Sequence, residues 1–199
     1  MKNIILASAS PRRREILGQV GVEFQVIPSN REEIITKSKP IEIVRELATM
    51  KSHEVYEQTQ EPVIVIGADA IVVHNNEIMG KPKEEEDAKR MLREIQDNTH
   101  EVYTGVSILI RDYDMNNQLM EKELSFEEAT KVSIYPMNED DIEAYVATKE
   151  PMDKAGAYAI QGEFAIYVKK IDGDYYNVVG LPVARIFQEL RKIGIDLLQ

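Results

Sequence analysis

The chain has 199 residues, of which 43% are apolar and 30% are charged, as in ordinary globular proteins. It contains no cysteine, which excludes disulfides, thiolate metal sites and a cysteine nucleophile and fits a reducing compartment, so we expect a cytoplasmic location. The net charge of -11 argues against a nucleic acid polymer as partner, so a polyanionic ligand must be small and must meet clustered cations. We expect a single domain over residues 1–199, built as one body or as two closely joined lobes.

The first residues predict a strand, a turn and a helix. Residues 3–7 form an apolar run far too short for a signal peptide or a membrane span, so we expect no membrane association. Ser10 is a good N-cap and Pro11 a good first helical residue, which places Arg12 and Arg13 in the first turn of the helix. Because basic side chains oppose the helix dipole there, this turn indicates an anion site.

A strand over 22–27, a polar loop over 28–39 and a helix from Pro40 to Glu57 are expected next. Lys51 falls on the apolar stripe of that helix, where a lysine is out of pattern. It either extends from the edge of the stripe into solvent or reaches a ligand.

Asp69 lies between two apolar runs of strand sequence, in Gly67-Ala68-Asp69-Ala70. An unpaired buried carboxylate costs several kcal/mol, which favours a functional role for Asp69 over a turn cap.

The remaining elements follow from the same patterns. They are a helix over 83–96 after Gly80-Lys81-Pro82, strands over 102–110 and 126–135 joined as a hairpin with a solvated tip over 111–123, a helix capped by Asn138, a loop over 153–162, a strand over 164–171 and a last helix opened by Pro182.

The unusual residues suit a small polyanion bound with a metal. They are Ser8, Ser10, Arg12, Arg13, Glu32, Glu33, Lys51, Asp69, Lys81, Asp153 and Lys154. A triphosphate carries roughly four negative charges and needs helix amides, arginines and lysines, while its hydrolysis needs a divalent ion held by carboxylates. Asp69 with Glu32 or Glu33 could hold that ion. The three histidines have no metal-ligand spacing.

Six short motifs together resemble the Maf family of nucleotide pyrophosphatases, in that family's order and over nearly the whole chain. They are Ser8-Ala-Ser-Pro-Arg-Arg13, Gly67-Ala-Asp69, Gly80-Lys-Pro82, Thr104-Gly105-Val106, Asp153-Lys-Ala-Gly-Ala-Tyr158 with Ile160-Gln161-Gly162, and Val179-Gly-Leu-Pro182.

The resemblance implies an α/β fold with a central mixed twisted sheet flanked by helices, and two lobes around a cleft, related to the inosine triphosphate pyrophosphatases. It implies cleavage of a nucleoside triphosphate to the monophosphate and pyrophosphate with Mg²⁺ or Mn²⁺, and a homodimer. The roles that it implies are Asp69 and Lys81 as catalytic residues, Ser8, Arg12, Arg13, Lys51, Ala70 and Gln161 as substrate-binding residues, and Glu33 with Asp69 as metal ligands.

Arg12 and Gln161 resemble the dTTP/UTP branch of the family. A glutamine amide offers a donor and an acceptor in one plane, which suits the imide edge of thymine or uracil. Ala70 departs from that branch, which usually has threonine there. The alternatives are 7-methyl-GTP or another modified nucleotide as substrate, and a non-catalytic nucleotide-binding regulator of cell division.

Overall fold

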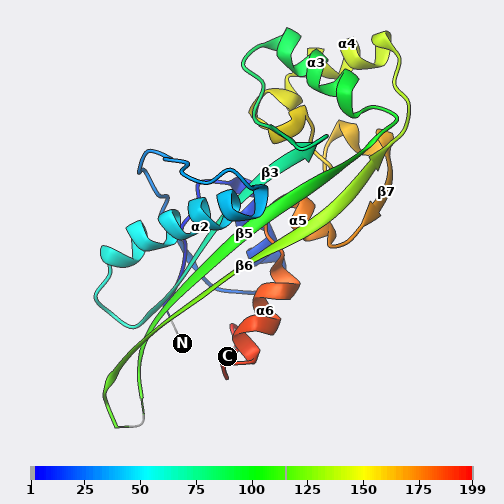
Figure 1. Cartoon of the computed structure of the whole chain (residues 1–199). Helices are drawn as coiled ribbons and strands as arrows, with labels where there is room; N and C mark the ends of the chain where they lie inside the picture. Colours follow the sequence, from blue (N-terminus) through cyan, green and yellow to red (C-terminus); the bar gives the residue numbers. More distant parts are fainter. Residues whose placement is uncertain (1–2, 115, 199) are drawn as a thin grey trace. The chain divides into compact units, whose positions relative to one another are not determined.

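The computed structural model describes residues 3–114 and 116–198 and has a mixed α/β architecture (Figure 1). The strands are β1 (Asn3–Leu6), β2 (Gln25–Val26), β3 (Val63–His74), β4 (Glu77–Met79), β5 (Thr99–Tyr113), β6 (Leu119–Ile134) and β7 (Val168–Asp172). The α-helices are α1 (Pro11–Gln19), α2 (Pro40–Glu57), α3 (Glu85–Ile95), α4 (Glu139–Ala147), α5 (Tyr175–Val179) and α6 (Val183–Arg191). Three short 3₁₀ helices are η1 (Glu150–Asp153), η2 (Ala155–Ala157) and η3 (Glu163–Tyr167). Within the described ranges, no helix is long and apolar enough to cross a membrane.

The sheet mixes parallel and antiparallel pairs, as expected. Its order is β2-β1-β3-β5-β6-β7, and β4 pairs with β3. Strand β1 runs parallel to β2 and β3, with Ile5 opposite Gln25 on one side and Val65 on the other. Strands β4 and β7 run antiparallel to β3 and β6.

The chain forms two compact units. The first comprises Met1–Asp69, Thr104–Glu128 and Gly180–Gln199, and the second comprises Ala70–Tyr103 and Ala129–Val179. Strands β3, β5 and β6 have residues in both units.

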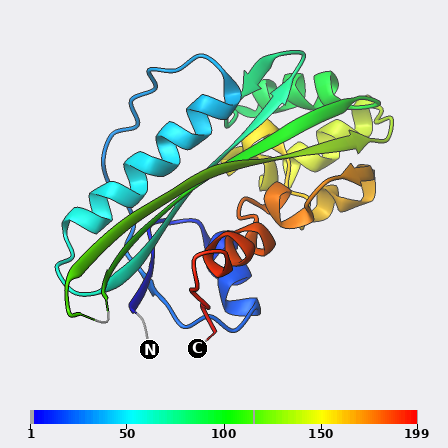
Figure 2. The ribbon, with the colours of Figure 1, turned by 60° about the horizontal axis from the view of Figure 1, so that its bottom comes forward.

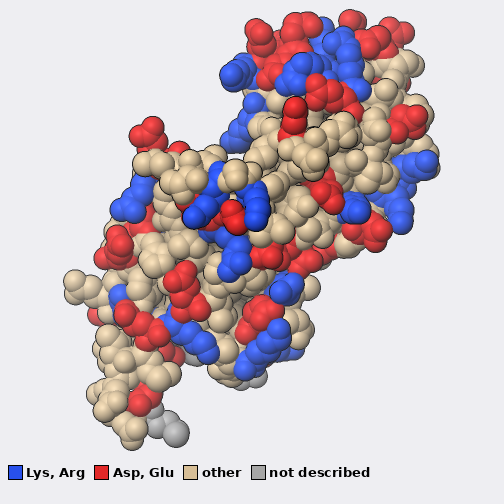
Figure 3. Space-filling view, viewed as in Figure 1, with Lys and Arg blue, Asp and Glu red and all other residues tan. Residues whose placement is uncertain are grey.

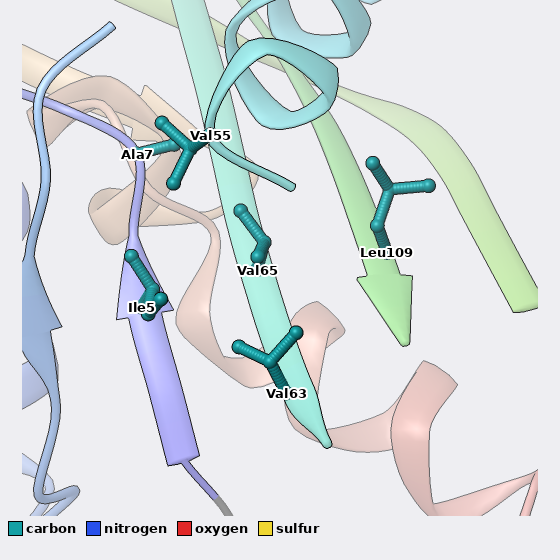
Figure 4. Packing of buried hydrophobic residues seen from close by; sticks show 6 residues of the cluster. All are labelled: Ile5, Ala7, Val55, Val63, Val65 and Leu109. Atoms are coloured by element: carbon teal, nitrogen blue, oxygen red, sulfur yellow. The ribbon is translucent and has the colours of Figure 1, made fainter. Parts of the chain in front are cut away.

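In the first unit, alternate strand residues face opposite sides of the sheet. Helix α2 covers one face, and α1 and α6 lie on the other (Figures 1 and 2). The α2 side is packed by a cluster of buried apolar side chains (Figure 4), Ile5, Ala7, Val55, Val63, Val65 and Leu109. A period of two therefore assigns Gly67 and Asp69, which continue the series of Val63 and Val65, to the α2 side as well.

The second unit is built around an aromatic cluster. Phe164 is fully buried, and its ring centroid lies 5.1, 4.8 and 5.5 Å from those of Tyr145, Tyr158 and Tyr167. Because these rings come from α4, the loop after η2 and η3, the cluster holds the 153–162 segment against α4.

Most expected elements are confirmed, and α2 has the predicted bounds. The predicted strand over 22–27 was too long, since β2 is only Gln25–Val26. The predicted hairpin is present, but its polar tip over 111–123 was drawn too long, because β5 and β6 continue through most of that stretch. Residues 164–167, the first part of the strand predicted over 164–171, belong to η3 instead, because Phe164 turns into the aromatic cluster.

A buried histidine makes the stability of the second unit depend on pH. His100 is 1% exposed, and its Nε2 lies 2.7 Å from the Tyr158 hydroxyl. Burial, with a smaller contribution from nearby His74, lowers the pKa of His100 from 6.5 to about 4. The folded state therefore disfavours a proton that the unfolded chain binds.

We expect the His100 contribution to the free energy of unfolding to fall as the pH is lowered from 6.5 to about 4. The fall is on the order of 3 kcal/mol in total. An NMR titration of the His100 ring should give the lowered pKa, and urea unfolding of His100→Gln should show a weaker acid dependence than wild type. His53→Gln is the control, because His53 is partly exposed. A His100 ring that titrates near 6.5 would contradict this account.

Candidate functional site

Two carboxylates converge on one lysine in the first unit. Lys51 Nζ lies 2.5 Å from Asp69 Oδ1 and 2.8 Å from Glu33 Oε1. The Asp69 and Lys51 side chains are 13% and 16% exposed, whereas Glu33 is 50% exposed. Lys51 thus reaches from α2 to Asp69 on β3. The alternative expectation, that its side chain extends into solvent, is wrong.

The loop that carries Glu33 is attached to α2 by two glutamates that no sequence pattern singles out. Glu54 accepts hydrogen bonds from the Ser29 hydroxyl and from the backbone amides of residues 30 and 31, the latter at 3.0 Å. Glu46 accepts from the amide of Thr36 at 2.9 Å and from its hydroxyl. These hydrogen bonds lower the pKa of both glutamates. Glu46, Glu54 and Lys51 lie on one helix, so α2 holds both sides of the loop and Glu33 between them.

Arg13 links the first motif to the last. Its guanidinium is buried, donates from Nε to the carbonyl of Gly180 at 2.8 Å, and donates from a terminal nitrogen to Ser8 Oγ at 3.1 Å. Burial lowers the pKa of Arg13, and the charge of Asp69 opposes that shift. A guanidinium keeps its proton in proteins, so Arg13 supplies a fixed positive charge near Asp69.

The start of α1 has the properties of an anion site. Ser10 makes no side-chain capping bond, and the first turn holds no acidic residue. Arg12 is partly exposed beside these amides. Backbone N–H groups and an arginine at a helix N-terminus favour a phosphate.

The carboxylates of Glu33 and Asp69 fit a divalent cation that is bound partly by the protein and partly by the substrate. The described residues contain no group of three or more acidic or histidine side chains able to hold a metal by themselves. Mg²⁺ in phosphate-transfer sites is commonly held by one or two carboxylates together with the phosphates of the substrate. Two carboxylates that already share one cation, Lys51, match that donor set.

In the second unit, the motifs of Lys81 and of the 153–158 loop contact each other. The Gly156 amide donates to the Gly80 carbonyl at 3.0 Å; Gly156 has a positive φ, and a Cβ there would lie 2.9 Å from the side chain of Val72. Lys81 is exposed immediately after this bond. Asp153 and Lys154 form an ion pair with each other.

Gln161 is exposed on a rigid turn of the same unit. Glu150 accepts from the Tyr145 hydroxyl at 2.7 Å and from the Glu163 amide at 3.0 Å. A Cβ on Gly162 would overlap the Glu150 carboxylate, which explains the glycine after Gln161. Ala70, the first residue of the second unit, is partly buried.

Charge on the molecular surface is mixed. Over the face drawn in Figure 3, acidic and basic side chains are interspersed among the described residues. Positive charge is therefore local on that face, as a small anionic ligand requires.

Comparison with known proteins gives one consistent family. The family described as Maf-like protein matches residues 3–193. The dTTP/UTP pyrophosphatase of Lachnoclostridium phytofermentans is 50% identical over 199 residues, which cover 100% of this chain and 99% of that protein. That of Agathobacter rectalis is 50% identical over 209 aligned positions, covering 99% of this chain and 100% of that protein. That of Bacillus thuringiensis subsp. konkukian is 48% identical, covering 99% and 98%.

A solved structure supports the fold. The HAM1 protein from Coxiella burnetii matches with a TM-score of 0.53 and 14% identity, covering 96% of this chain and 100% of that one. This likeness confirms the expected α/β fold.

Replacing Arg13 by methionine should destabilise the protein, because it leaves the buried Gly180 carbonyl without its donor. We expect a loss of about 2–4 kcal/mol in urea unfolding. Arg14→Met on the same helix is the matched control and should change stability by less than about 0.5 kcal/mol, since Arg14 is exposed. Equal effects of the two variants would show that the Arg13 bonds are not structural.

Proposed function

This chain belongs to the family of Maf-like proteins, and from that membership we propose that it hydrolyses dTTP and UTP to the nucleoside monophosphate and pyrophosphate. The observation that carries the proposal is the Asp69–Lys51–Glu33 cluster in a chain whose relatives over its full length are named dTTP/UTP pyrophosphatases. Residues 1–199 then act as one functional domain.

The reaction needs a base, a positive environment for phosphate and an ordered water. We assign Asp69 to accept the proton of the water that attacks the α-phosphorus. The bond between the α-phosphorus and the bridging oxygen breaks, and pyrophosphate leaves with that oxygen. Arg12, Arg13 and Lys81 stabilise the negative charge on the leaving group, and Ser8 binds a phosphate oxygen.

Glu33 and Asp69 would hold a divalent cation together with the phosphates of the nucleotide. When bound, Mg²⁺ or Mn²⁺ neutralises phosphate oxygens and lowers the pKa of a bound water. Lys51 balances the charge of Glu33 and Asp69 before the nucleotide arrives, and so keeps the two carboxylates close together.

Gln161 is assigned to the nucleobase. Its amide can donate to a carbonyl and accept from the imide N–H of thymine or uracil. Ala70 provides no hydroxyl for base or sugar, so selectivity falls more heavily on Gln161. A homodimer is a further proposal from the family resemblance, and sedimentation at micromolar concentration tests it. A cytoplasmic location is proposed from the absence of cysteine.

Asp69→Asn should lower kcat for dTTP by at least about 100-fold, because an amide cannot accept the proton. Binding of a non-hydrolysable dTTP analogue, measured with EDTA so that the loss of a metal ligand does not contribute, should change by less than about threefold. Asp172→Asn is the control, since Asp172 is exposed on β7. Turnover that survives in Asp69→Asn would move the role of base to another carboxylate, with Glu33 the next to test.

Pyrophosphate release should be fastest with dTTP and UTP in a panel that includes CTP, ITP, 7-methyl-GTP and the common purine triphosphates, and EDTA should abolish it. Gln161→Leu should lower kcat/KM for dTTP and UTP by about tenfold or more, as expected when the side chain can no longer donate to or accept from the base. Gln118→Leu, on the exposed hairpin, should have no effect. Preference for 7-methyl-GTP would retain the reaction and reject the role of Gln161; no turnover with any nucleotide would favour a regulator that binds without hydrolysis.

A further inference from the structure

Helix α2 touches the backbone of the sheet at two glycines. A Cβ on Gly67 of β3 would lie 2.6 Å from the carbonyl oxygen of Ala48 and 2.8 Å from the amide nitrogen of Ser52. A Cβ on Gly105 of β5 would overlap the carbonyl of Val44. Neither glycine has a positive φ, so the structure uses their lack of a side chain and not their backbone freedom.

The helix matches these glycines with one row of residues. Val44, Ala48 and Ser52 are spaced by four positions and therefore share one face of α2. On that face, the hydroxyls of Ser52 and Ser107 are hydrogen-bonded at 2.7 Å, and both residues are fully buried. Ser107 lies two residues after Gly105 and so on the same side of β5.

This close contact lies directly beside the proposed site. Asp69 follows Gly67 by two residues on the same side of β3, and Lys51 precedes Ser52 on α2. The separation between α2 and β3 is thus fixed where Gly67 meets Ser52. This contact is next to the ion pair of Lys51 and Asp69, whose Nζ and Oδ1 atoms lie 2.5 Å apart. Figure 4 shows the same side of the sheet, with Val65 of β3 among the side chains beneath Val55 of the helix.

We propose that Gly67, Gly105 and the Ser52–Ser107 hydrogen bond are positioning residues, which hold α2 close enough to the sheet for the Lys51 ammonium to lie between Asp69 and Glu33. The effect of this positioning on catalysis rests on the proposed function, whereas its effect on the separation of Lys51 and Asp69 does not. The proposal also gives a reason for two glycines of the motif set, in Gly67-Ala-Asp69 and Thr104-Gly105-Val106, that substrate contact does not explain.

The direct test is Gly67→Ala, which adds a methyl group between β3 and α2. We expect kcat for dTTP to fall by about 10- to 100-fold, because a misplacement of about 1 Å can cost that much, with KM changed by less than about threefold. Gly18→Ala is the matched control, since a Cβ there meets nothing within 4 Å, and its kinetics should equal those of wild type.

A double-mutant cycle separates positioning from general damage. If Gly67 acts through Lys51, Gly67→Ala should have almost no further effect on kcat in a Lys51→Met background. Effects that multiply in the double variant would overturn the proposal. Ser107→Ala adds no atoms and covers the case in which Gly67→Ala does not fold; it should lower kcat by about threefold or more through the same pair, and unchanged kinetics would count against the proposal.

Crystal structures of wild type, Gly67→Ala and Ser107→Ala give a readout independent of activity. We expect the separation of Lys51 Nζ and Asp69 Oδ1 to increase beyond about 4 Å, the limit of an ion pair, in Gly67→Ala, and to lengthen measurably in Ser107→Ala. An unchanged separation in both variants would overturn the inference even in an active enzyme. A wild-type protein without turnover would instead reject the proposed function, and the measured separation would still decide this inference.

Discussion

The carboxylate of Asp69 imposes the main constraint on the first unit. It stands on the strand that also contributes Val63 and Val65 to the core, where an uncompensated charge would cost several kcal/mol. Lys51 provides the compensation from α2, and so the helix must pass close to the strand. Gly67 makes that approach possible. The arrangement of the site and the packing of α2 against the sheet therefore depend on the same contacts.

Hydrogen bonds to backbone carbonyls connect the motifs within each unit. Arg13 bonds the carbonyl of Gly180, and the amide of Gly156 bonds the carbonyl of Gly80. Gly162 leaves space for Glu150, which fixes the turn beside Gln161. Gly67, Gly105, Gly156 and Gly162 stand where a Cβ would come within 3.0 Å of a neighbouring segment, so these glycines allow close packing around the residues assigned to the ligand.

Local patterns predicted much of this structure and part of the site. The start of α2 at Pro40 and the unusual character of Lys51 and Asp69 followed from periodicity and burial alone. Their contact could not be predicted, since it depends on how a helix lies on a sheet. The role of Glu54 could not be predicted either, because a helical glutamate near a polar loop is unremarkable in sequence. The length of the predicted hairpin was underestimated, because the solvated ends of its strands carry few apolar residues.

The most direct test of the whole account is the hydrolysis of dTTP by the wild-type protein in ¹⁸O-labelled water, with mass analysis of both products. Attack of a water at the α-phosphorus, activated by Asp69, predicts one labelled oxygen in dTMP and none in the released pyrophosphate. Label in pyrophosphate, or release of inorganic phosphate in its place, would contradict the account, because water would then have attacked a different phosphorus and the roles assigned around Asp69 would be wrong.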